Sequence, residues 1–242
     1  MDNRYSRQMI IQQIGVEGQE KLNKASVLVV GAGGLGSPVL TYLAAAGVGC
    51  LGLVDSDTVA LGNFNRQFLY NKNDIGRSKA DSAKEKLINL NDEIEIKTYN
   101  EYLTDQNVEN IFTGYDIILG AVDSFETRYA VNRACISLGM PYIDGGVNGF
   151  SGCVLFSNPP DTPCLNCVFP MAAAKKDPRS EVGVLGTTAG VIGTIEANIA
   201  LLWLLGLSNP VKNKLLMYDG LRMSIDHIEI KRDEECNVCR ER

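Results

Sequence analysis

The stretch from Val27 to Asp57, VLVVGAGGLGSPVLTYLAAAGVGCLGLVDSD, decides the fold of this chain. Its β-branched apolar start, Val27–Val30, predicts a buried parallel strand, and the glycine turn that follows leads into an alanine-rich helix ending near Gly47. A second apolar run, Leu51–Val54, stops at Asp55. Strand, glycine turn, helix, strand and terminal acid are typical of a βαβ unit in which the backbone approaches a phosphate and the acid meets a ribose hydroxyl. The stretch therefore predicts a nucleotide site.

Strands and helices alternate through the first three fifths of the chain. We expect helix Arg4–Lys21, strand Ser26–Val30, helix Leu35–Ala46, strand Leu51–Asp55, helix Lys79–Leu90, strand Glu95–Tyr99, helix Val108–Phe112, strand Asp116–Leu119, helix Glu126–Leu138 and strand Tyr142–Asp144. This order predicts an α/β fold, Rossmann-like and doubly wound, with a mostly parallel sheet.

The pattern changes after Asp144. There we expect strands Gly152–Phe156, Leu215–Tyr218 and Ile225–Ile230, which can pair antiparallel, a crossover loop at Met171–Gly186 and a helix around Ile192–Leu205. We interpret residues 1–242 as a single domain, with a nucleotide-binding half at about 1–145 and a mixed-sheet part with the cysteine pairs at about 146–242.

Composition restricts the class of protein. The chain has 242 residues and a net charge of −6, and the absence of a basic cluster argues against a nucleic-acid partner. Met1–Gln13 has no apolar core of a signal peptide, and the apolar stretch Gly190–Leu207 contains Glu196 and Asn198. We therefore expect a cytoplasmic enzyme with a buried apolar helix and no membrane span.

Acidic, amide and cationic side chains follow the second strand. Asp55 and Asp57 come first, and the loop then carries Asn63, Arg66 and Gln67. An arginine over the strand ends suits a triphosphate, whose charge must be neutralised during displacement. Asp57 could instead cap the loop.

Lys79 begins the next predicted helix, where a phosphate ligand or a solvated lysine is the alternative. Asp123 and Ser124 follow the strand Asp116–Leu119, at the edge where such folds bind ligands. Asp123 could hold Mg²⁺, which prefers one or two carboxylates and substrate phosphates, or it could cap the following helix.

Cysteines supply a metal signal. The pairs Cys164-x-x-Cys167 and Cys236-x-x-Cys239 predict one closed, structural Zn²⁺ site, with a redox dithiol as the alternative. The other three, Cys50, Cys135 and Cys153, lie in apolar segments and are expected to be buried core thiols. His227 is the only histidine, so a Ser-His or Cys-His catalytic pair is not expected.

Together these residues resemble the bacterial ubiquitin-activating-like adenylyltransferases of the MoeB/ThiF/HesA family. The resemblance covers nearly the whole chain, from Arg4-Tyr5-Ser6-Arg7-Gln8 through the motifs above to both cysteine pairs. It implies an enzyme that uses MgATP to adenylate the C-terminal Gly-Gly carboxylate of a ubiquitin-like sulfur-carrier protein, giving an acyl adenylate and pyrophosphate for molybdopterin or thiamine-type sulfur transfer.

The resemblance also implies roles for individual residues. Gly34 approaches the nucleotide and Asp55 holds the ribose. Asn63, Arg66 and Lys79 hold the phosphates, and Asp123 positions Mg²⁺. Arg7 matches an arginine that family dimers supply to the neighbouring subunit's ATP, which implies a homodimer.

One departure concerns the crossover loop. Some relatives carry there a cysteine that joins covalently to the activated carrier, and Ala172–Gly186 contains none. We therefore expect the reaction to stop at the acyl adenylate. Two alternatives remain: adenylation of a peptide or tRNA-borne carboxylate, or, in a different class, an NAD-dependent oxidoreductase, in which Arg66, Lys79 and the cysteine pairs have no evident role.

Overall fold

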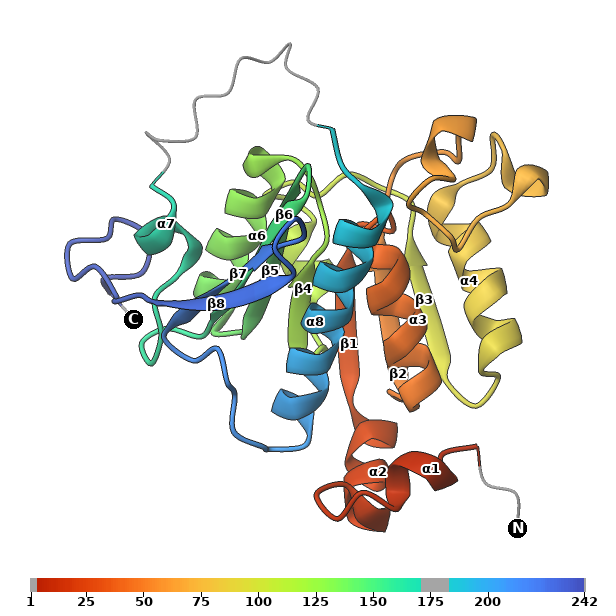
Figure 1. Cartoon of the computed structure of the whole chain (residues 1–242), viewed down its shortest axis with the longest axis horizontal. Coiled ribbons are helices and arrows are strands. Elements are labelled where there is room, and N and C mark those ends of the chain that lie inside the picture. Colours follow the sequence, from red (N-terminus) through yellow and green to blue (C-terminus); the bar gives the residue numbers. More distant parts are fainter. Residues whose placement is uncertain (1–3, 171–182, 242) are drawn as a thin grey trace.

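An eight-stranded sheet organises the computed structural model, which describes residues 4–170 and 183–241. The strands are β1 (Ser26–Val30), β2 (Cys50–Val54), β3 (Glu95–Tyr99), β4 (Ile117–Gly120), β5 (Tyr142–Asn148), β6 (Ser151–Ser157), β7 (Lys214–Asp219) and β8 (Ser224–Glu229). Their order is β3-β2-β1-β4-β5-β6-β7-β8. Parallel pairing joins β3 through β5, and antiparallel pairing joins β5 through β8 (Figure 1).

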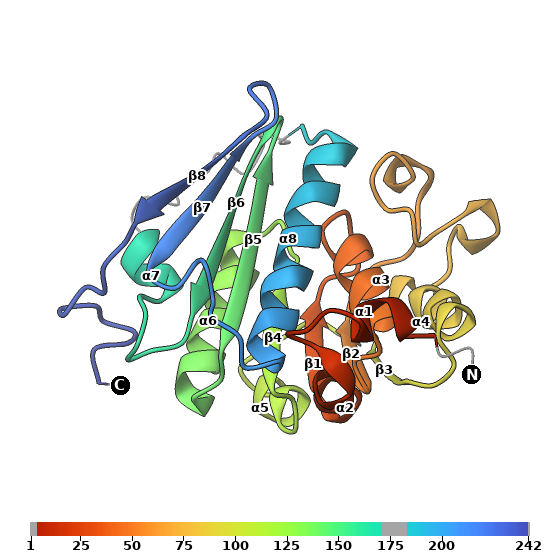
Figure 2. The same ribbon diagram turned by 60° about the horizontal axis from the view of Figure 1, so that its bottom comes forward.

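Helices cover both faces of this sheet. They are α1 (Ser6–Met9), α2 (Gly15–Lys24), α3 (Gly36–Ala46), α4 (Lys79–Leu90), α5 (Val108–Phe112), α6 (Phe125–Leu138), α7 (Leu165–Val168) and α8 (Gly186–Leu204), with 3-10 turns η1 (Leu61–Asn63) and η2 (Lys72–Asp74). Figure 2 shows α3 and α8 side by side on one face. In β1, Val27 and Val29 enter the core formed with α3, α4 and α8, whereas Leu28 and Val30 enter the core formed with α5 and α6. A strand buried on both faces explains the continuous apolar run in the sequence.

The predicted elements agree with the structure over most of the chain. The helix Lys79–Leu90 and the strand Glu95–Tyr99 have the predicted bounds, and the predicted antiparallel strands are present as β6, β7 and β8. The strand expected at Tyr142–Asp144 continues to Asn148, because β6 returns beside it as a hairpin partner. The fold is therefore the predicted doubly wound α/β sheet with antiparallel C-terminal strands. Of the predicted crossover loop, residues 171–182 lie outside the described part of the chain.

The prediction of one helix over Arg4–Lys21 is wrong. The structure has two helices, α1 and α2, separated by residues 10–14, and Gly15 begins α2 with a positive φ of 57°. A residue with a positive φ at that point interrupts the right-handed helical backbone, so the two segments cannot form one continuous helix. Both helices lie at the amino-terminal ends of the strands (Figure 1).

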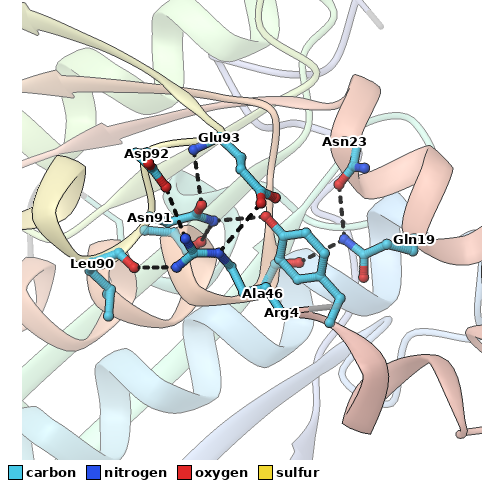
Figure 3. A network of polar contacts seen from close by, with 10 residues as sticks. Arg4, Gln19, Asn23, Ala46, Leu90, Asn91, Asp92 and Glu93 are labelled. Carbon is cyan, nitrogen blue, oxygen red and sulfur yellow. Dashed lines mark hydrogen bonds and ion pairs between the residues drawn. The ribbon is translucent and has the colours of Figure 1, made fainter. Parts of the chain in front are cut away.

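A polar network anchors the N-terminal segment to the loop after α4 (Figure 3). Arg4 donates to the Leu90 carbonyl at 2.6 Å and forms an ion pair with Asp92 at 2.9 Å. Fully buried Asn91 donates to the Tyr5 hydroxyl at 2.9 Å and to the Ala44 carbonyl at 2.7 Å. These bonds hold α1 against the end of α3.

The helix α8 is long and apolar enough to cross a membrane by length and composition, alone among the helices within 4–170 and 183–241. In this fold it packs on α3 and on strands β5 and β6. Its residues Ile192, Glu196 and Ile199 are buried there. The packing agrees with the predicted buried apolar helix.

Candidate functional site

A crevice lies at the carboxyl ends of the parallel strands, with a volume of about 1330 Å³. The chain leaves β1 toward β2 on one side and β4 toward β5 on the other, which is the switch point where doubly wound sheets bind ligands. The nucleotide residues expected from the sequence all line it: Gly34, Asp55, Asp57, Asn63, Arg66, Gln67, Lys79, Asp123 and Ser124. Strand order thus brings together residues from three separate segments, which follow β1, β2 and β4.

The glycine turn forms the floor of the crevice because side chains do not fit there. Gly31 has a φ of 98°, and a Cβ at this position would lie 2.6 Å from the Ala121 carbonyl oxygen. A Cβ on Gly36, the first residue of α3, would overlap the carbonyl of Gly31. The absence of side chains lets helix and strand pack closely and brings backbone N–H groups to the ligand side.

Asp55 is tied to the glycine turn. Its Oδ2 accepts from the Ala32 N–H at 2.8 Å and its Oδ1 from the Asp57 N–H at 2.9 Å. Burial raises the pKa of Asp55, and the Ala32 N–H partly offsets this effect. Each oxygen keeps a lone pair, so the carboxylate can still accept from a ribose hydroxyl.

Lys79 is a buried cation that pairs with Asp57. Its Nζ lies 2.8 Å from Asp57 Oδ2, and its side chain is 7% exposed against 58% for Asp57. Ser78 caps α4 by accepting from the Asp81 N–H, so Lys79 occupies the first position of that helix. The solvated lysine considered from the sequence does not fit this burial.

The loop after β2 contributes Asn63, Arg66 and Gln67. Asn63 Oδ1 accepts from the Ala60 N–H at 2.9 Å, which leaves its amide N–H groups for a ligand. Arg66 Nη1 donates to the Gly62 carbonyl and to Asn65 Oδ1 at 3.2 and 2.8 Å. Gln67 is buried, yet its Oε1 has no hydrogen-bond partner within the described ranges. A buried amide oxygen without a hydrogen-bond partner is expected where a bound ligand can donate to it.

Ser124, not Asp123, caps α6. The Ser124 hydroxyl accepts from the Thr127 N–H at 3.5 Å. Asp123 is exposed on the crevice wall, so its carboxylate remains available to a cation. The two acidic groups Asp123 and Asp55 follow β4 and β2, on either side of β1.

Arg7 is not part of this crevice. It lies on α1, at the opposite end of the strands (Figure 1). One chain therefore does not bring Arg7 to its own nucleotide residues.

Several residues that line the crevice were not predicted from the sequence. Arg128, Gly146 and Phe169 belong to the far side of the crevice, beyond Asp123. Burial works against the charge of Arg128, but the carboxylate of Asp144 raises the pKa of the guanidinium, which stays protonated. Gly146 is a residue of β5, and nothing in the sequence around it indicated a ligand-binding position.

Two thiols differ from the prediction. Cys135 is buried as expected, whereas Cys50 is only half-buried, at the first position of β2. Cys153 is half-buried and lines the crevice, because β6 returns next to β5 and places this side chain beside Gly146. Burial raises the pKa of Cys153 to about 11, although Arg128 lowers it in part.

The two cysteine pairs meet in one cluster. The Sγ atoms of Cys164 and Cys167 are 3.7 Å apart, those of Cys164 and Cys236 3.7 Å, and those of Cys167 and Cys239 3.5 Å. All four sulfurs lie within 4.8 Å of one another. Tetrahedral zinc with Zn–S bonds of about 2.3 Å separates its sulfurs by about 3.8 Å. The donor set and spacing therefore fit a closed Zn²⁺ site between α7 and the C-terminal tail.

Known proteins with related sequences cover nearly the whole chain. A sulfur carrier protein adenylyltransferase of Thermus thermophilus is 43% identical over 244 residues, which are 98% of this chain and 90% of that protein. The adenylyltransferase and sulfurtransferase MOCS3 of Culex quinquefasciatus is 40% identical over 239 residues, and the match spans 98% of this chain and 55% of that longer protein.

Solved structures agree with this likeness. The crystal structure of E. coli MccB with ATP matches with a TM-score of 0.86 at 26% identity and covers 99% of this chain and 74% of that one. MccB with AMPCPP and MccA matches with a TM-score of 0.87 at 25% identity, covering 98% of this chain and 74% of that one. The ThiF family matches residues 5–238 of this chain. The chain therefore belongs to the ThiF family.

Proposed function

We propose that this protein is an adenylyltransferase that uses ATP to activate the C-terminal Gly-Gly carboxylate of a ubiquitin-like sulfur-carrier protein. The observation that carries the proposal is the gathering of two cations, Arg66 and Lys79, and one carboxylate, Asp123, in a crevice floored by the glycine turn. The Thermus relative, named a sulfur carrier protein adenylyltransferase, and the MccB structure with ATP support it.

The chemistry requires positioning and charge stabilisation. A carboxylate oxygen of the carrier attacks the α-phosphorus of ATP, the bond to the bridging oxygen of the β-phosphate breaks, and pyrophosphate leaves with that electron pair. The product is an acyl adenylate. Arg66 and Lys79 are suited to bind the departing phosphates, because cations aimed at developing charge stabilise a transition state.

The remaining nucleotide residues have simpler roles in the proposal. Gly34 lets the backbone approach the phosphates, and Asp55 accepts from the ribose. Asn63 and Gln67 supply amide groups near the phosphates. Asp57 holds Lys79 in place through the ion pair described above.

Asp123, with Ser124 beside it, would hold Mg²⁺. When bound, the ion neutralises phosphate charge and orients the leaving pyrophosphate. The carboxylate of Asp123 is exposed and does not cap a helix, so it is suited to coordinate the ion.

Exchange of labelled pyrophosphate into ATP tests the reaction. We expect exchange that depends on a carrier, and Arg66→Ala or Asp123→Ala should lower it by about a hundredfold or more. Arg133→Ala and Glu126→Ala are matched controls on exposed positions of α6 outside the crevice, and they should leave exchange unchanged. Tight NADH binding without ATP binding would contradict the proposal and favour an oxidoreductase.

We also propose a homodimer in which Arg7 reaches the partner's ATP, because Arg7 lies far from its own crevice. Arg7→Ala should leave the dimer intact and abolish most adenylation. Mixing it with Asp123→Ala subunits should restore activity, since a heterodimer contains one site with both residues. Full activity in an enforced monomer would refute the shared site.

The proposed product stays noncovalent. Ala172–Gly186 contains no cysteine, and Cys153, which lines the crevice, has a pKa raised to about 11, so little of it is the nucleophilic thiolate near neutral pH. Mass spectrometry after incubation with carrier and MgATP should show no adduct. A reductant-sensitive enzyme–carrier adduct would refute this, and Cys153→Ser would then identify its site.

We propose that residues 1–242 act as one adenylyltransferase domain in the cytoplasm, without a nucleic-acid partner, and that zinc at Cys164, Cys167, Cys236 and Cys239 fastens the tail. The net charge of −6 and the cysteine geometry support these points.

A further inference from the structure

The Arg128 guanidinium is a buried, rigidly held cation on the crevice wall. The residue is 5% exposed, yet it lines the crevice. Its Nε donates to Asp144 Oδ1 at 3.0 Å, and its Nη2 pairs with Asp144 Oδ2. The Tyr142 hydroxyl donates to Asp144 Oδ1 at 2.6 Å, and the Phe125 ring lies 4.7 Å from the Arg128 Cζ. The fork, the hydroxyl and the ring fix the plane of the guanidinium.

The third nitrogen of Arg128 makes no bond to Asp144. In the parts of the chain that the structure describes, no oxygen atom accepts from Nη1, whereas both other nitrogens are bonded to Asp144. The Cys153 thiol also interacts with the guanidinium. A Cβ at Gly146 would lie 3.3 Å from Nη2 and 3.4 Å from Nη1. Cys153 Sγ would lie 3.2 Å from the same Cβ, so this thiol also borders the outer edge of the guanidinium. A larger side chain at position 146 would stand against that edge, and glycine leaves room there.

The position of Nη1 suits one part of the substrate. The glycine turn, Arg66 and Lys79 line the β1–β2 side of the crevice, where the nucleotide is proposed to bind. Arg128 lies in the second turn of α6, five positions after Asp123, on the opposite side. The crevice contains three carboxylates, those of Asp55, Asp57 and Asp123, which repel an incoming anion. A carboxylate at the end of the substrate therefore needs a hydrogen-bond donor of its own.

We propose that Arg128 binds the terminal carboxylate of the substrate tail through Nη1 and presents it to the α-phosphate, while Asp144 and Phe125 hold the guanidinium in place. The assignment rests on the proposed adenylation. It explains why an ion pair is buried at the crevice wall and why the residue above it is a glycine. Arginine suits the role, since its planar fork can bind Asp144 with two nitrogens and a second carboxylate with the third.

Measuring the affinity of enzyme variants for carriers with and without the terminal carboxylate distinguishes a binding role of Arg128 from a structural one. The probes are the carrier protein that supports pyrophosphate exchange, once with its free Gly-Gly carboxylate and once with that terminus converted to an amide. Calorimetry without ATP should give the wild-type enzyme a preference for the carboxylate of about tenfold to a hundredfold, the range of a hydrogen bond to a charged group. Arg128→Lys keeps a charge beside Asp144 but loses the third donor, and its preference should fall below threefold.

A second variant keeps the test valid if Arg128→Lys does not fold. Removing one partner of a buried ion pair destabilises a protein strongly, whereas replacing both with apolar residues is often tolerated. The double variant Arg128→Met/Asp144→Leu should therefore stay folded, bind ATP with unchanged affinity and show the same loss of preference. Arg133→Lys, on the exposed side of α6, should keep the wild-type preference.

Three outcomes would overturn the inference. If the Arg128 variants weaken binding of carboxylate and amide carriers equally, Arg128 has only a structural role. If ATP affinity falls together with carrier affinity, Arg128 maintains the structure of the whole crevice and does not bind the carrier's terminal carboxylate specifically. If no carrier supports exchange, the proposed adenylation fails and the inference with it.

Discussion

Replacing Glu196 with glutamine should change how stability depends on pH. Glu196 lies in the middle of α8, is fully buried, and has no hydrogen-bond partner for either carboxyl oxygen within the described residues. It packs against Gly145 so closely that a Cβ there would overlap the carboxyl group. Burial raises the pKa of Glu196 well above 4.5, the charge of Asp144 raises it further, and Arg128 offsets part of this effect.

The sign follows from proton binding in the two states. The folded protein keeps the Glu196 proton at pH values where the unfolded chain, with a pKa near 4.5, has released it. The contribution to stability is therefore complete below about pH 4.5 and decreases as pH rises toward the folded-state pKa. Over that interval the free energy of unfolding falls by up to about 1.4 kcal/mol per pH unit.

Glutamine has nearly the same shape and no proton to release. Relative to the wild type, Glu196→Gln should gain up to about 2.7 kcal/mol between pH 5.5 and 7.5 while the folded carboxyl remains neutral. Urea unfolding can be followed through Trp203, the only tryptophan, whose ring lies 5.2 Å from that of Phe156. Saturating zinc in both proteins keeps the cysteine site equal, so the difference isolates Glu196.

The exposed Glu17 on α2 offers a matched control. Glu17→Gln should differ from the wild type by a nearly constant free energy across the same pH range. If the Glu196→Gln difference were equally constant, the folded carboxyl would be ionised, and the reasoning from burial would be refuted.

Three further substitutions have expected effects on stability and metal content. Cys236→Ser should lower zinc to well below one ion per chain and lower Tm more than it lowers exchange activity, because a closed site is structural; elemental analysis and calorimetry measure both. Asn91→Ala should cost about 2–3 kcal/mol in urea unfolding, since the two buried hydrogen bonds of Asn91, to the Tyr5 hydroxyl and to the Ala44 carbonyl, are lost. Phe156→Ala should cost about 3–5 kcal/mol by leaving a cavity in the core and should change Trp203 fluorescence.

Controls for these substitutions lie nearby. Cys50→Ser, outside the cysteine cluster, should keep the metal, and exposed Asn89→Ala should change stability by less than about 0.5 kcal/mol. Full zinc content in Cys236→Ser would contradict the four-cysteine site. An Asn91→Ala protein as stable as Asn89→Ala would show that the network of Figure 3 contributes nothing to folding.

Local patterns in the sequence determined the fold class and most of the residues that line the β1–β2 side of the crevice. The run from Val27 to Asp57 contains a strand, a turn, a helix and a strand in contiguous residues, so propensity and periodicity suffice to interpret it. The spacing of each cysteine pair likewise lies within one turn. Because a doubly wound sheet exposes the carboxyl ends of its strands at one edge, residues after β2 and β4 could be assigned to a common site before their distances were known.

Tertiary structure alone decided which distant side chains share that site. Arg128 and Asp144 pair because α6 packs on β5, and Cys153 enters the crevice because β6 folds back beside Gly146. The break after α1 and the place of Arg7 depend on a left-handed Gly15 and on contacts made far along the chain. Glu196 had no visible role in an apolar helix until α8 was packed against Gly145. Such features depend on which strands become neighbours and which face each side chain takes, and a pattern of contiguous residues contains neither.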